Sequence, residues 1–140
     1  MPEIKFDTGI REFTVNGAAK VRFCPTDMSF VEKVFTAVET IDKKTELFQN
    51  RVQKLESNRD VFDEAHAIDN EIREILNGIF NEDVCTPIFG TMNTFAVADG
   101  LPVWANFLFA IMDLLDSDLV EQKKKTNPRL KKYIDKYKRR

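Results

Sequence analysis

At 140 residues, with 43% hydrophobic and 31% charged side chains and a net charge of -2, the chain has the size and composition of one globular domain that needs no disulfide or metal to hold its core. Its two cysteines, Cys24 and Cys85, stand too far apart for a CxxC metal or redox motif, which favours a reducing cytoplasm, with a Cys24–Cys85 disulfide as the alternative. No basic stretch followed by an apolar one marks a secretory signal at the N-terminus.

The N-terminal segment alternates apolar and polar side chains, the pattern of strands with one buried face. A two-residue turn at Gly9-Ile10 and a three-residue loop at 17–19 place every apolar side chain on the same face. The expected cross-strand pairs are Phe6–Phe13, Ile4–Val15, Phe13–Phe23 and Val15–Val21. We therefore predict a small three-stranded antiparallel meander whose apolar face packs on another element.

Two heptad patterns after Pro25 predict a long αα-hairpin, with Thr26 or Asp27 as the first N-cap. The first seam consists of Val31, Val34, Val38, Ile41, Thr45, Phe48, Val52 and Leu55. Polar residues 57–60 interrupt the pattern, and the second seam consists of Val61, Ala65, Ile68, Ile72, Ile75 and Ile79. Two seamed helices with a short polar connection pack antiparallel.

The most apolar stretch, ADGLPVWANFLFAIMDLLD at residues 98–116, predicts a helix buried on most sides. Asp99 or Gly100 is expected to cap it, with Pro102 in its first turn. Asp99 and Asp113 enclose too short a run for a membrane span, which needs about 20 apolar residues. The predicted fold is α+β and mainly α: the meander, the hairpin, this buried helix and a helical tail.

No pattern of catalytic residues is present, so we expect a protein that is not an enzyme and has no metal or cofactor. His66 is the only histidine and has no nucleophile set around it, and Cys85 has no base beside it. The glycines form no phosphate-binding loop. The carboxylates along the second hairpin helix are interpreted as its solvated face: Asp60, Asp63, Glu64, Asp69, Glu71 and Glu74.

Charge divides the chain into an acidic domain, residues 1–122, and a basic tail, residues 123–140. The tail holds ten Lys or Arg and one Asp, a charge of +9, whereas the other 11 basic and 22 acidic side chains give -11. Asn127-Pro128 starts a predicted helix with an apolar-aromatic stripe at positions i, i+3, i+4 and i+7. The candidate partner-binding residues are Lys123, Lys124, Lys125, Arg129, Leu130, Lys131, Lys132, Tyr133, Ile134 and Tyr137.

This tail fits three surfaces. It could fold back on the acidic body of its own chain, bind an acidic groove of another protein, or bind nucleic acid. Nucleic acid is the least expected, because no zinc finger, RNP or helix-turn-helix signature is present.

Three stretches of the sequence, taken with the long charged hairpin, carry a family resemblance: EIKFDTGIREFTVNG, IFGTMNTFAVADGLPVWANFLFAIMD and TNPRLKKY. Together they resemble small tail-module proteins of Firmicutes phages and prophages, and in particular tail assembly chaperones. The resemblance implies a helper that binds the tape-measure protein before the tail tube polymerises, in the cytoplasm of the bacterial host.

Two other functions stay open: an inhibitor that binds a host defence protein, and a minor structural protein of the tail. We also expect a homo-oligomer, because the meander face and the long seams together have more apolar surface than one small domain normally buries.

Overall fold

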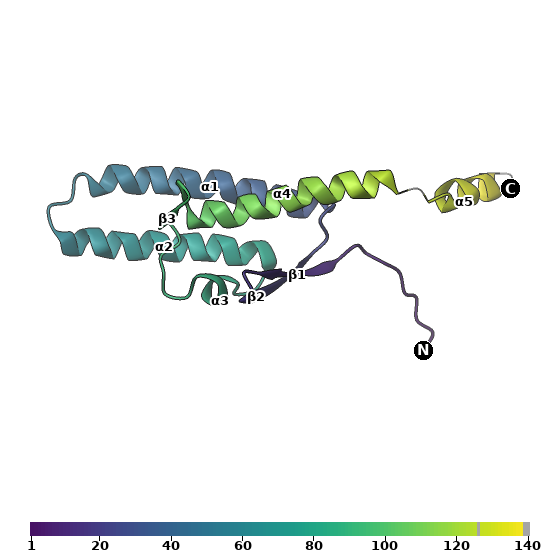
Figure 1. The fold of residues 1–140 in the computed structure, drawn as a ribbon, viewed down its shortest axis with the longest axis horizontal. Helices are drawn as coiled ribbons and strands as arrows, with labels where there is room; N and C mark the ends of the chain where they lie inside the picture. The colour runs from purple at the N-terminus through teal and green to yellow at the C-terminus, as the bar shows by residue number, and fades with distance from the viewer. Residues whose placement is uncertain (126, 139–140) are drawn as a thin grey trace.

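Three long helices form the body of the protein, and two small sheets and two shorter helices are attached to it (Figure 1). The computed structural model describes residues 1–125 and 127–138. In chain order the elements are β1 (Arg11–Val15), β2 (Ala19–Phe23), α1 (Met28–Val52), α2 (Asn58–Phe80), α3 (Cys85–Phe89), β3 (Val97–Ala98), β4 (Leu101–Pro102), α4 (Val103–Lys124) and α5 (Arg129–Lys138). This architecture confirms an α+β protein that is mainly helical.

The predicted helical hairpin is present as α1 and α2, which lie side by side (Figure 1). The Asp27 carboxylate accepts the Ser29 N–H at 2.9 Å, and the Ser57 hydroxyl accepts the Arg59 N–H at 3.1 Å. Each side chain satisfies a donor that the first helical turn leaves free, which is why the helices begin there. At the end of α2, Asn81 takes the left-handed conformation, with φ 57°, and closes the helix.

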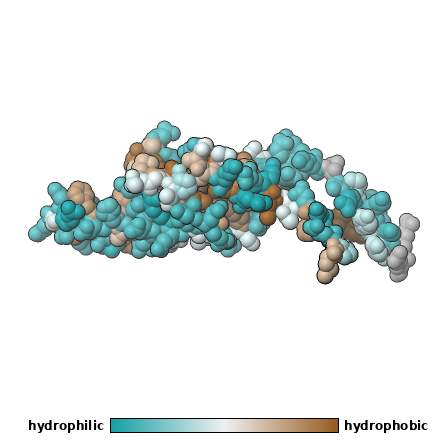
Figure 2. Space-filling model, turned by 90° about the horizontal axis from the view of Figure 1, so that it is seen from below, coloured by the Kyte–Doolittle hydropathy of each residue, from teal (hydrophilic) through white to brown (hydrophobic). Residues whose placement is uncertain are grey.

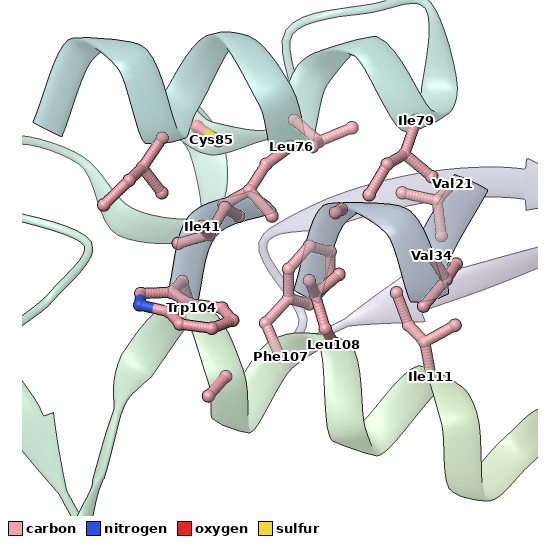
Figure 3. Close-up of a cluster of buried hydrophobic side chains, with 14 of the residues drawn as sticks. Val21, Val34, Ile41, Leu76, Ile79, Cys85, Trp104, Phe107, Leu108 and Ile111 are labelled. Carbon is pink, nitrogen blue, oxygen red and sulfur yellow. The ribbon is translucent and has the colours of Figure 1, made fainter. Parts of the chain in front are cut away.

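The core lies between α1, α2, α4 and the face of the β1–β2 sheet (Figure 3). Ile41 of α1, Ile72 of α2 and Leu108 of α4 are each fully buried at its centre. In the first seam Val34, Ile41 and Phe48 are buried. The seam residues between and beside them are half-buried, namely Val31, Val38, Thr45 and Val52. Leu76, outside the predicted second seam, is also fully buried. α2 therefore packs with the period of an ordinary globular helix rather than with a strict heptad.

The N-terminal sheet has two strands, so the prediction of a three-stranded meander is wrong. Ile4 and Phe6, assigned to the first strand, are 90% and 78% exposed. The Asp7 carboxylate accepts the Gly9 N–H at 2.8 Å, and the Thr8 hydroxyl accepts the Ile10 N–H at 3.5 Å. Such local side-chain bonds to the backbone compete with strand pairing, and here the segment extends away from the sheet (Figure 1).

The register of the two remaining strands also differs from the expected one. Phe13 lies opposite Val21, not Phe23, and Val15 lies opposite Ala19. Asn16 and Gly17 both have positive φ, 51° and 67°, and form the turn between the strands. Asn-Gly supplies the two left-handed residues that such a turn requires. Because the shift is two residues, the apolar side chains still share one face.

The residues predicted to cap the apolar helix, Asp99 and Gly100, form a turn that precedes the helix instead. Asp99 and Gly100, with φ 55° and 77°, connect β3 to β4, and Pro102 occupies the N-cap position without a side-chain bond. The first free donors of α4 find backbone acceptors in the preceding loop: Val103 N–H binds Ala96 O at 2.8 Å, and Trp104 N–H binds Thr94 O at 2.9 Å. Loop carbonyls therefore take the role expected of Asp99.

α4 is confirmed as a buried helix, but it is buried on one side only. Trp104, Phe107, Leu108, Ile111 and Leu115 face the core, whereas Phe109 is 37% exposed. Trp104 and Phe107 are 3% and 7% exposed and so belong to the interior (Figure 3). Among the described residues, no helix combines the length and the apolar character that a membrane span requires.

Candidate protein-binding surface

The predicted partner-binding residues gather at the end of the molecule where α4 stops. Lys123 and Lys124 belong to the last turn of α4, and Lys125 is its C-cap. The other seven predicted residues all lie in α5. Of the predicted tail, Thr126, Arg139 and Arg140 lie outside the described residues.

α5 begins at the predicted place. The Asn127 side chain accepts the Arg129 N–H at 3.0 Å, and the Pro128 carbonyl accepts the Lys132 N–H at 3.0 Å. The Asn127 side chain therefore acts as the N-terminal cap, and Pro128 fits the first turn because that turn needs no N–H from it.

The apolar stripe of α5 faces solvent along its whole length. Leu130 is 74% exposed, Tyr133 43%, Ile134 54% and Tyr137 56%, and no residue of α5 is buried. The helix continues beyond the end of α4, away from the body (Figure 1). The tail therefore does not fold back on its own acidic domain in this structure. A helix this short has little stability alone, so burying the exposed Leu130, Tyr133 and Ile134 against another surface would stabilise it.

Cations lie against both rings of the stripe. The Arg129 guanidinium stands 6.0 Å from the Tyr133 ring centre, and the Lys136 ammonium 5.7 Å from that of Tyr137. These contacts are at the range at which a cation is attracted to an aromatic face. α5 therefore presents aromatic and positive character on one small surface, which suits an apolar groove with an acidic rim.

A mainly apolar groove, with Glu32 among its lining residues, lies between α1 and α4, and sequence reasoning missed it. This α1–α4 groove has a volume of about 370 Å³ and is lined by Met28, Ser29, Val31, Glu32, Phe35, Met112 and Leu115. Met28 is 75% exposed and Phe35 54%, so large apolar groups reach the surface there. Met28 and Phe35 recur at helical spacing on either side of the seam residue Val31, but their pattern does not reveal that α4 supplies the other wall. Figure 2 shows one face of the molecule, where apolar atoms interrupt the hydrophilic surface of the body.

Asp69 is not on the solvated face of α2, which corrects the sequence interpretation. Its carboxylate accepts the Thr94 N–H at 2.6 Å, the Thr94 hydroxyl at 2.8 Å and Arg73 Nε at 3.0 Å. Arg73 in turn donates Nη2 to the carbonyl of Gly90 at 2.9 Å and of Met92 at 2.6 Å. One turn further along α2, Asn77 Oδ1 accepts two backbone donors at the start of α3. This row of polar side chains holds the loop that leads into α4 and is structural.

The two cysteines are both free, and Cys85 is fully buried. Burial raises the pKa of the Cys85 thiol to about 12, because the thiolate would lose its hydration. Its sulfur lies 3.7 Å from the Arg73 carbonyl. His66 is exposed on α2. Within residues 1–125 and 127–138, no group of three or more His, Cys, Asp or Glu is arranged to hold a metal ion.

A second hollow lies beside Trp104, between α1 and the β3–β4 turn. It has a volume of about 390 Å³ and is lined in part by Phe48 and Phe95, whose ring centres are 5.3 Å apart. The Trp104 Nε1–H has no hydrogen-bond partner among the described residues, but it is sealed from solvent. Because Asp42, Glu46 and Gln49 also line the hollow, its surface is partly polar and partly aromatic, and the Trp104 N–H is not exposed to it.

No protein-family model, curated protein or solved structure matches the chain. The exposed stripe of α5 and the α1–α4 groove are accordingly interpreted from their own chemistry.

Proposed function

We propose that the protein is a non-enzymatic binding protein that acts as a tail assembly chaperone, holding the tape-measure protein of a phage before the tail tube polymerises. A tape-measure protein is long and helical, and its apolar stripes associate with one another unless something covers them. A small helper with an exposed amphipathic helix can cover such a stripe and leave when the tube protein replaces it.

The observation that supports this proposal is the exposed stripe of α5. Leu130, Tyr133 and Ile134 lie on one face of a helix that extends from the body, with lysines and arginine on either side. Two amphipathic helices associate through such i, i+3, i+4 and i+7 positions, and the flanking cations select acidic surfaces. At 1.5 Å per residue the ten residues of α5 cover roughly 15 Å of a client helix. Many copies would then be needed to cover a long client.

Co-expression with the tape-measure protein of the same phage, followed by affinity purification, tests the proposal. The wild-type chain is expected to retain the tape-measure protein in solution and to purify with it. The double variant Leu130→Asp and Ile134→Asp removes the stripe without touching a buried residue, and it is expected to lose the client. The matched control, Phe62→Asp, changes a 55% exposed side chain on α2 and should still capture the client.

Mass spectrometry on phage-infected cells separates this function from its alternatives. Recovery of the tape-measure protein supports the chaperone. A host defence protein recovered in its place would identify an inhibitor. Stable incorporation into purified particles would identify a minor structural protein of the tail, since a chaperone leaves before the particle matures. Either result would overturn the proposal.

A further inference from the structure

The α1–α4 groove is mainly apolar, and Glu32 is the one charged side chain among its lining residues. On α4 the exposed Asp116 lies one helical turn after the lining residue Met112, and on α1 the exposed Lys33 follows Glu32. Neither Glu32 nor Asp116 forms an ion pair with another described residue. A basic helix with apolar side chains would bring cations close to these two carboxylates while it fills the groove.

α5 has the matching properties. Its described residues include five Lys or Arg and one Asp, a charge of +4, around the stripe of Leu130, Tyr133, Ile134 and Tyr137. The side chains are long enough to enter a groove whose own walls are Met and Phe, and methionine adapts readily to the shape of an inserted side chain. Charge and apolar character thus agree between the two surfaces of the same chain.

We propose that the α1–α4 groove binds α5 of a second copy of this chain. Each copy holds its own α5 away from its body, beyond the end of α4 (Figure 1), so the groove and the exposed Leu130, Tyr133 and Ile134 are accessible in an isolated chain. Two copies can exchange their tails, each covering the groove of the other. Such a reciprocal exchange closes on itself with twofold symmetry and gives a dimer.

The exchange does not depend on the proposed function. It has a consequence for that function, however, because α5 has a single stripe and cannot cover a groove and a client at once. A client helix would have to displace α5 from the neighbouring copy. The dimer is then the resting form, in which the stripe is kept from unspecific association.

The test is the mass of the purified full-length chain in solution, measured by light scattering and sedimentation over a range of concentrations. A dimer is expected, weakened at high salt because its charges are screened. Leu130→Asp in α5, or Phe35→Asp in the groove, is expected to raise the dissociation constant about tenfold or more, since each removes a buried apolar side chain. Phe62→Asp is the control for Phe35→Asp, because the two phenylalanines are 55% and 54% exposed on neighbouring helices.

Mixing the two variants distinguishes exchange between copies from folding back within one. The Leu130→Asp chain keeps an intact groove and the Phe35→Asp chain keeps an intact α5, so the mixture is expected to form a heterodimer through one complete contact. A chain that stays monomeric at every concentration overturns the proposal, and so does a dimer that neither variant weakens. Neither of these results affects the client-capture experiment, whose readout is the tape-measure protein.

Discussion

Replacing Asp69 by alanine tests whether the polar row on α2 holds the loop that leads into α4. The change leaves Thr94, which is fully buried, with an N–H and a hydroxyl that both lose their acceptor. Arg73 loses its ion pair but keeps its two bonds to loop carbonyls. Because Thr94 is fully buried, both donors lose a buried acceptor, and buried donors without an acceptor destabilise a fold.

The magnitude follows from the two buried donors. Each unsatisfied donor costs about 1–3 kcal/mol, so the loss of two acceptors in Asp69→Ala is expected to lower the free energy of unfolding by about 2–6 kcal/mol. With a urea dependence of about 2 kcal/mol per molar, the unfolding midpoint should fall by about 1–3 M. Circular dichroism of the helices during urea unfolding measures this shift. Hydrogen exchange should also show faster exchange of the Thr94 amide.

Asp63→Ala is the matched control, because Asp63 is an exposed carboxylate on the same helix. It is expected to change stability by no more than about 0.5 kcal/mol. If Asp69→Ala and Asp63→Ala unfold at the same urea concentration, the hydrogen bonds to Thr94 do not stabilise the fold and the structural role given to Asp69 is wrong.

Three further predictions concern the tail, the cysteines and the glycines. Deleting residues 127–140 should abolish client capture and leave the body folded, because no residue of α5 is buried in a single chain. At concentrations low enough for the chain to be monomeric, its unfolding temperature should stay within about 2 °C of the wild type, whereas at higher concentrations the deletion should also remove the stability that the proposed dimer contributes. Unfolding of the dilute truncated chain would show instead that the tail is structural. Native-state alkylation followed by mass spectrometry should modify half-buried Cys24 before Cys85, because a pKa of about 12 keeps Cys85 a thiol at pH 8. In the unfolded chain the same thiol ionises near pH 9. The Cys85 thiol therefore favours folding below pH 9, and its contribution to the free energy of unfolding is lost as the pH rises from 9 to 12. Gly78→Ala lies inside α2 with open space around it and should raise the free energy of unfolding by about 0.5–1 kcal/mol, because alanine favours the helix more than glycine does. Gly17→Ala should lower the free energy of unfolding by about 1 kcal/mol, because φ 67° is strained for a residue with a Cβ. Equal effects of the two substitutions in thermal unfolding would contradict this reasoning.

The elements that sequence reasoning predicted correctly depend on neighbours within a few residues. Asp27 caps α1 because its side chain reaches the donor two residues away. Asn127 and Pro128 start α5 in the same way, and the apolar spacing that follows places its stripe on one face. Helical periodicity and capping are local, so a short window of sequence contains all the information they need.

Other features were decided by contacts between distant segments. Asp69 has the same sequence signature as the exposed carboxylates around it, and only the approach of Thr94, 25 residues later, gives it a structural role. The pairing of β1 with β2 and the extension of residues 1–10 depend on which hydrogen bonds compete best, a balance that apolar alternation does not express. The α1–α4 groove exists because α1 and α4 pack together, so that Phe35 from one helix and Met112 from the other line the same hollow. The sequence by itself determined the long helices, the caps of α1 and α5 and the amphipathic tail. Tertiary packing decided which polar groups are buried, what caps α4 and where the α1–α4 groove is formed, because burial is a property of all the elements together.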